Sequence, residues 1–370
     1  MRKPRLYITG PQCFYPGGEH QLLTMKYLAE EYGFEVTNIR EKMGFDDCDP
    51  ATGKQPLRKL TPDYLDDCDI VVGDVSFFRG GEPESGTIFE LGVGFARGKK
   101  LYSFTRDRRD VIHRYPVGQL CPDGKILDEH GMGYATAHTA GNLMYMVPSK
   151  IVEGDFEACL KTIVMDLIEE AKDRGQRIVP RQDLRAQSTW PLGELPRAYL
   201  AGFECFLLNA REVGDRMKAF ALDHGVEGIF PPDEAPGLKE PEDMSDVYTR
   251  SAFYFDRDQL HIRNSNMVIA NLNPYHGHEP DSGTVFESGM SFGLDYRCYC
   301  FLSDGRDLIE KVPCNRGEDG IYRDIEGYRV ENCGQPLASI IASNMTVVVG
   351  GFKEAILKVE EDTERLKRGE

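Results

Sequence analysis

The chain contains 370 residues, of which 41% are hydrophobic and 28% are charged, and its formal net charge is −17. This length and composition favour an ordinary buried core and two domains rather than one. The negative charge disfavours nucleic acid partners. Because no stretch approaches the roughly 20 apolar residues that span a bilayer, and the start lacks the apolar centre of a secretory signal, we expect a cytoplasmic protein without membrane partners. Ten cysteines without a Cys-x-x-Cys pair favour reduced thiols over a zinc site or a disulfide framework.

The first half of the sequence alternates between apolar runs and amphipathic stretches. A strand-like run at 5–10 ends in a glycine, and the helix-like stretch at about 19–32 is closed by Gly33. The run at 69–74 is short and almost continuously apolar, as expected of a strand buried on both faces. The segments that follow are an acidic loop at 82–90, a strand at 100–104 and a last amphipathic helix that begins near Phe156.

The second half repeats this order of segments. The run at 197–202 resembles the one at 5–10, and Gly225 closes a helix-like stretch at about 211–223. The remaining matching segments are a strand at 266–271, an acidic loop at 279–287, a strand at 297–302 and a last helix that begins near Phe352.

Strands that alternate with helices predict parallel sheets covered by helices on both faces. We therefore expect an α/β protein made of two tandem doubly wound parallel-sheet domains, flavodoxin-like or Rossmann-like, that form a pseudo-dimer within one chain. The predicted domains are 1–175 and 197–370. The proline-containing segment 176–196 breaks both periodicities and is predicted to be a linker. Sites in such folds lie beyond the carboxyl ends of the strands.

The acidic loops are near copies, EPESGTIFE at 82–90 and EPDSGTVFE at 279–287. Each contains Thr-x-x-Glu, which fits a capping box in which threonine caps a helix and glutamate reaches back to the cap amide. The capping box leaves the acid six residues before each glutamate unexplained. It also leaves the Ser-Gly pair, Ser282 and Gly283 in the second loop, whose small size lets a ligand approach the backbone.

A functional interpretation explains more of the loop. A glutamate in the first helical turn, stabilised as an anion by the helix dipole, is suited to act as a carboxylate nucleophile. Such a nucleophile fits displacement at an anomeric carbon, where a covalent glycosyl-enzyme can form. The acid at the start of the loop would hold substrate hydroxyls, and the tyrosine of the first strand, Tyr7 or Tyr199, would orient the nucleophile.

These residues together resemble a known family. Tyr-x-x-Gly at 199–202, Asp258 eight residues before Asn266, the Asn-Leu-Asn element at 271–273 and the loop at 279–287 look like the nucleoside 2-deoxyribosyltransferases. The resemblance covers nearly the whole chain, twice. Relatives that resemble this pattern include N-glycoside hydrolases that act on nucleosides and nucleotides.

The resemblance implies roles for individual residues. Glu287 would be the nucleophile, Tyr199 its orienting partner, and Asp258 the group that exchanges a proton with the nucleobase. Asp281 would bind the 5′-hydroxyl of the sugar. In this family a neighbouring subunit completes the pocket through an Asn-x-Met element, and Asn142 with Met144 in the first repeat matches it, so that the first repeat would complete the site of the second.

The corresponding site in the first repeat would contain Tyr7, Glu84 and Glu90. Alignment of the repeats pairs Thr61 with Asp258, although Asp63 lies two residues further on, and it pairs Ala338 with Asn142. We therefore expect one working site per chain, in the second repeat, with the first-repeat site degenerate. The alternative is that both sites are active.

The resemblance implies base exchange between 2′-deoxynucleosides and free nucleobases, with no metal and no cofactor. The alternatives are an N-glycoside hydrolase, in which water captures the same intermediate, and a non-catalytic nucleoside-binding module. A nucleotide substrate is disfavoured because Asp281 would repel a phosphate. A metal site at His276 and His278 is the weaker interpretation, because no third ligand is placed by spacing. Further homo-oligomerisation stays open.

Overall fold

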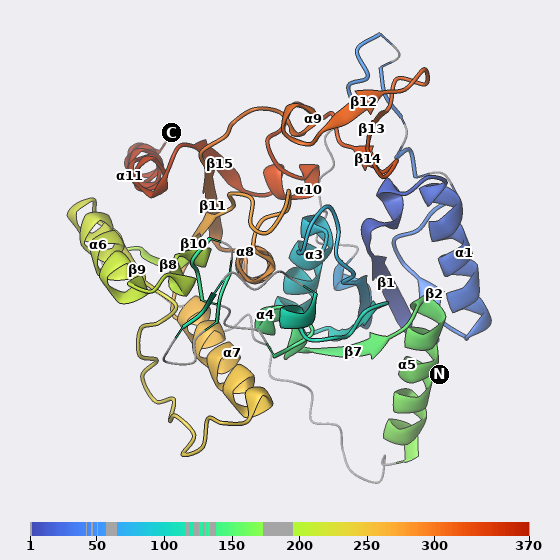
Figure 1. The fold of residues 1–370 in the computed structure, drawn as a ribbon, viewed down its shortest axis with the longest axis horizontal. Helices are drawn as coiled ribbons and strands as arrows, with labels where there is room; N and C mark the ends of the chain where they lie inside the picture. Colours follow the sequence, from blue (N-terminus) through green and yellow to red (C-terminus); the bar gives the residue numbers. More distant parts are fainter. Residues whose placement is uncertain are drawn as a thin grey trace.

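The computed structural model describes residues 2–41, 43–45, 47–49, 51–56, 65–114, 119–121, 126–128, 130–133, 138–172 and 195–369. Two parallel sheets of five strands each form the centre of the protein (Figure 1). The first sheet belongs to the first repeat and has the strand order β2-β1-β3-β4-β7. Its strands are β1 (Arg5–Thr9), β2 (Glu35–Val36), β3 (Ile70–Asp74), β4 (Lys100–Thr105) and β7 (Ser149–Glu153).

The second sheet has the order β9-β8-β10-β11-β15, which is the order of the first sheet for the equivalent strands. It is the doubly wound, flavodoxin-like order. The duplicated α/β fold predicted from the sequence is thereby confirmed. Its strands are β8 (Arg197–Ala201), β9 (Glu227–Ile229), β10 (Met267–Asn271), β11 (Arg297–Leu302) and β15 (Thr346–Val349).

Alternating side chains of the first strands face two different cores, as the period of a strand requires. Leu6 and Ile8 pack with α1 and α5 in an outer core of the first repeat, and Ala198 and Leu200 take the same part in the second repeat. Between them, Tyr7 and Tyr199 point into a central core shared by both repeats. The helices of the first repeat are η1 (Pro11–Phe14), α1 (Gly18–Glu31), α3 (Ser85–Ala96), η2 (Val111–His113), α4 (Leu143–Met146) and α5 (Phe156–Lys172).

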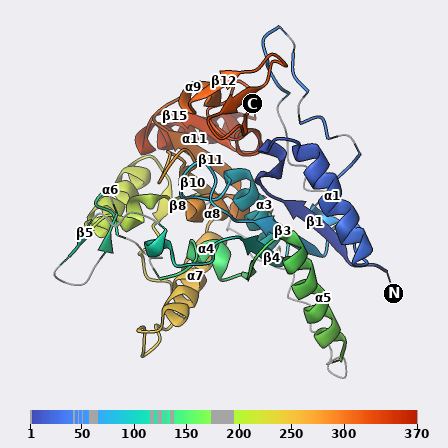
Figure 2. The same ribbon diagram turned by 45° about the vertical axis from the view of Figure 1, so that its right-hand side comes forward.

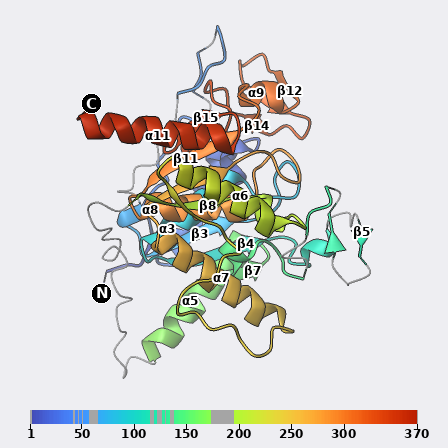
Figure 3. The same ribbon diagram turned by 90° about the vertical axis from the view of Figure 1, so that its left-hand side faces the viewer.

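The helices of the second repeat follow the same plan. They are η4 (Phe203–Phe206), α6 (Ala210–Asp223), α7 (Val247–Arg263), α8 (Ser282–Gly293), α9 (Leu308–Lys311), α10 (Ser339–Ala342) and α11 (Phe352–Arg368). Figure 3 shows α6 and α11 on the outer side of the second sheet, with α7 below them. The last helices begin at Phe156 and Phe352, as predicted.

The two repeats meet through α3 and α8, which cross at backbone contact. A Cβ atom on Gly92 would lie 2.2 Å from the carbonyl oxygen of Phe286, and one on Gly289 would lie 2.1 Å from that of Phe89. These four residues are related by one constant offset of 197 in the sequence. The crossing therefore has approximate twofold symmetry, and the chain is an intrachain pseudo-dimer.

Each repeat also sends a small β insertion over the other repeat. The first insertion holds β5 (Gln119–Leu120) and β6 (Ile126–Leu127), and Figure 2 shows β5 beside α6. The second insertion contains β12 (Cys314–Arg316), β13 (Tyr322–Asp324) and β14 (Arg329–Val330), and Figure 1 shows it beside α1 and β1. An ion pair of 2.7 Å between Arg79 and Asp324 fastens the second insertion to the first repeat. The insertions thus place residues of one repeat above the strand ends of the other.

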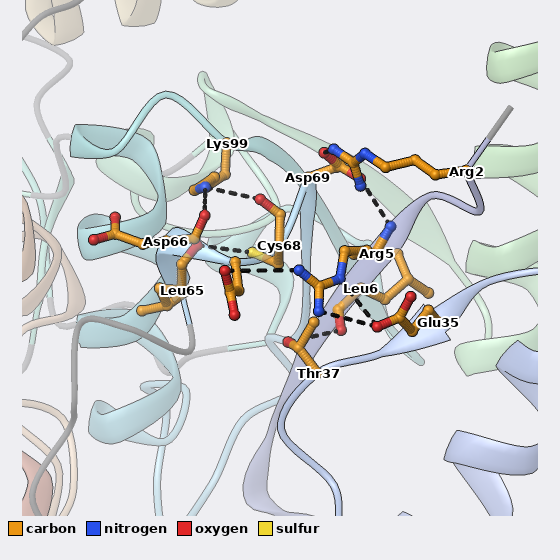
Figure 4. A network of polar contacts seen from close by, with 11 residues as sticks. Arg2, Arg5, Leu6, Glu35, Thr37, Leu65, Asp66, Cys68, Asp69 and Lys99 are labelled. Carbon is orange, nitrogen blue, oxygen red and sulfur yellow. Dashed lines mark hydrogen bonds and ion pairs between the residues drawn. The ribbon is translucent and has the colours of Figure 1, made fainter.

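A polar network lies at the amino end of the first sheet (Figure 4). Arg2 donates two hydrogen bonds of 2.8 and 2.6 Å to Asp69, and the backbone N–H of Arg5 donates to the same carboxylate. The Arg5 side chain also contacts Glu35 on the neighbouring strand. Because Arg2 is exposed, we assign this network to strand alignment, with little contribution to stability.

Three sequence predictions fall outside the described residues. They are residues 176–194 of the linker predicted at 176–196, and Thr61 and Asp63, which the alignment of the repeats compares with Asp258. Among the described helices, none is both long enough and apolar enough to cross a membrane.

Candidate active site

The tyrosine of β8 and the second glutamate of the acidic loop meet beyond the centre of the second sheet. The hydroxyl of Tyr199 donates a hydrogen bond of 2.7 Å to Oε1 of Glu287 on α8. Both side chains are buried. β8 lies between β9 and β10, so its tyrosine faces the central core, where α8 presents the glutamate. The pairing of Tyr199 with Glu287 matches the sequence prediction, while their catalytic roles remain a proposal.

The capping-box interpretation is wrong. Helix α8 begins at Ser282, its N-cap is Asp281, and the Asp281 carboxylate accepts hydrogen bonds from both the N–H and the hydroxyl of Thr284. Glu287 therefore lies beyond the first helical turn, contrary to the sequence prediction. The helix dipole acts most strongly within that first turn, so it stabilises the Asp281 anion rather than Glu287.

Neighbouring acids shape the protonation of Glu287. Burial, followed by the charge of Asp258, raises the pKa of Glu287 well above its usual range, and the hydrogen bond from Tyr199 opposes this rise. Burial also raises the pKa of Asp258 to about 6, against the adjacent Arg257 guanidinium, whose Nε lies 3.0 Å from it. Asp258 stands on α7, and both acids are buried. The ionisation of Asp258 is thus linked to that of Glu287 in the interior of the protein.

The first repeat reaches the second-repeat site through α4. Asn142 caps this helix by accepting the N–H of Met144 at 3.0 Å, and its amide donates to Oδ1 of Asp281 at 3.2 Å. Met144 is buried in the central core. A Cβ on Gly283 would lie 2.5 Å from the Asn142 amide nitrogen, so glycine is needed here to admit the asparagine. At the equivalent position of the second repeat, Ala338 caps α10 without a side-chain hydrogen bond.

Ser282 lies in the same loop but contacts protein. Its N–H and its hydroxyl both donate to Glu82 of the first repeat. The equivalent bond runs from the N–H of Ser85 to Glu279 at 3.1 Å. These reciprocal contacts tie the two acidic loops together, so the Ser282 hydroxyl is engaged at the interface of the repeats.

The first repeat holds an equivalent carboxylate arrangement. Glu90 accepts hydrogen bonds from the hydroxyls of Tyr7, at 2.6 Å, and Thr9. Glu84 caps α3 and accepts from the backbone N–H groups of Gly86 and Thr87, each at 2.7 Å. Burial raises the pKa of Glu90 to about 7, and burial with the charge of Glu279 raises that of Glu84 to about 8. The predicted second-site residues are therefore assembled.

A cavity of about 320 Å³ opens at this first-repeat site. That volume falls in the range of about 300–1,000 Å³ that is typical of ligand pockets. Residues of the second repeat close one side of the cavity, from β14 to the start of α10. The lining residues include Tyr7, Phe14, Glu84, Glu90, Arg329 and Glu331.

Two polar pairs at the strand ends were not predicted as site residues. In the first repeat the amide of Gln12 donates to Asp74 at 2.6 Å, and in the second the amide of Asn271 donates to Glu204 at 2.7 Å. The acid and the amide have exchanged positions between the repeats. The other oxygens, Gln12 Oε1 and Glu204 Oε2, are buried without a hydrogen-bond partner among the described residues. Aligning the repeats reveals this exchange in the sequence.

The histidines of the loop at 276–278 were considered as metal ligands, and the structure gives His276 a different role. His276 is buried, and its Nε2 lies 2.8 Å from Asp128 of the first insertion. This contact is the counterpart of the pair formed by Arg79 and Asp324 in the other half of the pseudo-dimer. In the described part of the chain, no group of three or more His, Cys, Asp or Glu side chains is arranged to hold a metal ion.

Each repeat has a buried tyrosine–carboxylate pair beyond its parallel strands. Beside each pair, a second acid caps the N-terminus of a helix. The protein is therefore an α/β protein with a duplicated carboxylate site. A family model described as nucleoside 2-deoxyribosyltransferase matches residues 6–144 and 198–340, which together exceed half of the chain. The chain belongs to the nucleoside 2-deoxyribosyltransferase family and contains its domain twice.

Individual relatives match about half of the chain. An uncharacterised protein from Schizosaccharomyces pombe is 26% identical over 183 residues, which are 45% of this chain and 85% of that protein. A solved structure of a 2-desoxiribosyltransferase from Leishmania mexicana is 25% identical, with a TM-score of 0.35, and the match covers 45% of this chain and 97% of that chain.

Proposed function

We propose that the protein exchanges the base of a 2′-deoxynucleoside at the second-repeat site, through a covalent intermediate on Glu287. The observation that carries the proposal is the buried Glu287 carboxylate, held 2.7 Å from the Tyr199 hydroxyl and close to Asp258. Family membership supports glycosyl transfer as the class of reaction. We assign Glu287 as nucleophile, Tyr199 as its orienting group and Asp258 as proton donor and acceptor.

In the first step an oxygen of Glu287 forms a bond to the anomeric carbon C1′, and the bond from C1′ to the base nitrogen breaks. The electron pair of that bond leaves with the base, which takes a proton from Asp258. In the second step the nitrogen of another base attacks C1′, releases Glu287, and returns a proton to Asp258. The reactants are a nucleoside and a free nucleobase, and every other group is a side chain, so no step calls for a cofactor.

The two linked acids share one proton in the arrangement that this reaction needs. Asp258 has a pKa of about 6, and its charge adds to burial in raising the pKa of Glu287, so at rest the proton lies on Glu287. A proton on Asp258 removes that repulsion and so favours ionised Glu287. Attack therefore requires that the proton move from Glu287 to Asp258, which gives an anionic nucleophile beside a protonated general acid.

The sugar end of the site is assigned to Asp281 and Asn142. Oδ2 of Asp281 accepts hydrogen bonds from Thr284, and Oδ1 accepts one of 3.2 Å from the Asn142 amide. A carboxylate oxygen can accept more than one hydrogen bond, so we assign Oδ1 to the 5′-hydroxyl of the sugar. Met144 and Gly283 pack around this contact. Ser282 contributes by holding the loop against Glu82 rather than by touching the substrate.

The proposal is tested by replacing each glutamate in turn. A Glu287→Ala chain should lose base exchange almost completely, whereas Glu90→Ala should keep much of it. Incubation of the wild-type chain with a 2′-deoxynucleoside alone should add the mass of one deoxyribosyl group to the peptide that contains Glu287. Equal losses in the two variants contradict the single-site assignment.

Transfer and hydrolysis are separated in the same assay. If transfer dominates, addition of a second free base suppresses release of deoxyribose and yields the new nucleoside. Deoxyribose that forms equally fast with and without the second base would instead assign the protein as an N-glycoside hydrolase. Binding of a nucleoside without either product or a glycosyl adduct would assign a non-catalytic module.

A further inference from the structure

The first-repeat cavity contains a buried arginine whose side chain forms no ion pair with the residues that the structure describes. Arg329 lines the cavity and is only 5% exposed. Its Nε is buried without a hydrogen-bond partner among the described residues. The guanidinium carbon lies over the rings of Phe14 and Phe45, with distances of 5.4 and 5.6 Å to their centroids. Because an unpaired buried charge is costly, an arginine in this position is suited to pair with an anionic ligand.

The fold holds Arg329 in place. Its carbonyl oxygen accepts a hydrogen bond of 2.6 Å from Arg79, whose Nε forms the buried ion pair with Asp324 on the adjacent strand. β14 is thus locked onto the first repeat at the point where it carries Arg329 into the cavity. A guanidinium fixed in this way is ready to form two parallel bonds to a planar or tetrahedral anion.

The carboxylates of the cavity form hydrogen bonds with other groups. Glu331 accepts both the N–H and the hydroxyl of Ser339, at 2.9 and 2.6 Å. Glu84 is held by the N-terminus of α3, and Glu90 by Tyr7 and Thr9. Burial raises the pKa of Glu84 to about 8 and that of Glu90 to about 7, so near neutral pH these two acids are largely or partly protonated and repel an anion less than ionised carboxylates would.

The second-repeat site differs at this position. The offset of 196 that pairs Asp128 with Asp324 also pairs Gly133 with Arg329. Gly133 donates its N–H to the carbonyl of Phe206, at 2.7 Å, and has no side chain to offer a ligand. One chain thus carries two related sites, of which the first has an added cation where the second has a glycine.

We propose that the first-repeat cavity binds a 2′-deoxynucleoside 5′-monophosphate, with Arg329 contacting the phosphate. We infer a nucleoside because both sites contain the same buried tyrosine–carboxylate pair, and to that extent the inference rests on the proposed function. We infer a phosphate because the Arg329 guanidinium is positively charged and can donate two parallel hydrogen bonds. The first repeat is then a binding site for an anionic ligand, and the second a site for neutral nucleosides.

The test is calorimetric binding to a Glu287→Gln chain, in which the proposed exchange at the second site is silent. The monophosphate should bind at least about 10-fold more tightly than the matching nucleoside, and Arg329→Gln should weaken it by roughly 10- to 100-fold. Binding of the nucleoside should change by less than about 3-fold, since a neutral ligand makes no ion pair.

The matched control is Arg323→Gln, on the neighbouring strand β13, where Arg323 pairs with Asp319 at 2.7 Å. This variant should bind the monophosphate as tightly as its parent chain. If Arg329→Gln does not fold, Arg329→Lys keeps the charge without the fork and should give an intermediate loss. Equal affinity for monophosphate and nucleoside, or a preference that survives both changes at Arg329, overturns the proposal. Absence of base exchange in the wild-type chain would leave this measurement unaffected.

Discussion

Asn142 of the first repeat and Asp281 of the second are joined by a hydrogen bond of 3.2 Å between the asparagine amide and the carboxylate. The same asparagine caps α4, and Gly283 leaves the space in which it approaches. One side chain thus connects a helix start in one half of the chain to a helix start in the other. The proposed sugar site exists only when both repeats are folded against each other.

Replacing Asn142 by alanine should reduce kcat/KM for base exchange by roughly 10- to 100-fold. Asp281 would lose the donor that orients it, and a hydrogen bond to a charged group contributes about 1.5–3 kcal/mol. Loss of the helix cap should also cost about 1 kcal/mol of stability. Steady-state kinetics and urea unfolding of the same variant separate these two effects.

The control for this change is Asn209→Ala at the N-cap of α6, which makes no side-chain cap bond. It should leave kcat/KM unchanged. If the two asparagine variants lose activity equally, the bond across the repeats has no special part in binding the sugar.

Replacing Tyr199 by phenylalanine should move the acid limb of the kcat/KM profile to higher pH by about one to two units. The Tyr199 hydrogen bond lowers the pKa of Glu287 against the effects of burial and Asp258. Without it the glutamate ionises only at higher pH, and its bond is worth about 1.5–3 kcal/mol. The pH dependence of base exchange, measured from pH 5 to 9, gives the shift.

Tyr7→Phe is the matched change in the first repeat, where Tyr7 donates to Glu90 at 2.6 Å. On the single-site proposal it should leave the profile of the exchange reaction in place. If the pH profile shifts in the Tyr7→Phe variant and not in the Tyr199→Phe variant, the reaction takes place in the first repeat.

The sheets were predictable because strand and loop patterns are local and occur twice. The runs at 69–74 and 266–271 are apolar enough to indicate central strands, and β3 and β10 are buried at every position. The capping box was predicted wrongly because local spacing does not reveal distant partners. Thr-x-x-Glu is a local signal, whereas the partner of Glu90 is Tyr7, 83 residues away in the sequence.

The two β insertions show what the sequence does not reveal. Arg79 and Asp324 are 245 residues apart, and neither lies in a pattern that predicts their ion pair. The sequence does not indicate that Arg329 enters the first-repeat cavity. Its counterpart in the first repeat is Gly133, so a comparison of the repeats finds no matching residue. Such contacts depend on how the repeats pack, which periodicity within each repeat does not encode.

Replacing Glu90 by glutamine should make the free energy of unfolding less dependent on pH between about 4.5 and 8. Burial raises the folded-state pKa of Glu90 from 4.5 to about 7, so the folded chain holds this proton between those values while the unfolded chain releases it. The free energy of unfolding therefore falls as pH rises through this window, by up to about 3 kcal/mol from this group. The difference between variant and wild type should grow by that amount from pH 4.5 to 8 in urea unfolding.

Glu157→Gln provides the contrast, because this exposed glutamate has a lowered pKa through its bonds with Lys161 and Tyr32. Its stabilising contribution is present above its unfolded pKa and is lost on acidification, which is the opposite sign. A Glu90→Gln chain whose stability follows the wild type at every pH would show that Glu90 ionises freely.

The crossing of α3 and α8 should tolerate no side chain at its centre. A Cβ on Gly289 would lie 2.1 Å from the carbonyl oxygen of Phe89, and backbone cannot move aside as a flexible side chain can. Alanine in place of glycine favours a helix by about 1 kcal/mol, but overpacking costs about 1–3 kcal/mol and here separates two helices. Gly289→Ala and Gly92→Ala should therefore both destabilise the chain, by about 2 kcal/mol or more in urea unfolding.

Gly351→Ala at the start of α11 is the control for these changes, since its Cβ would meet only the end of the Glu354 side chain at 3.4 Å. It should change stability by less than about 1 kcal/mol. The two crossing variants test the symmetry of the pseudo-dimer as well. Because an added Cβ would lie 2.2 Å from a carbonyl oxygen at Gly92 and 2.1 Å from the equivalent one at Gly289, the costs of the two substitutions should agree within about 1 kcal/mol. A large cost at only one glycine would mean that the helices relax on one side, and that the interface supporting both sites is not symmetric.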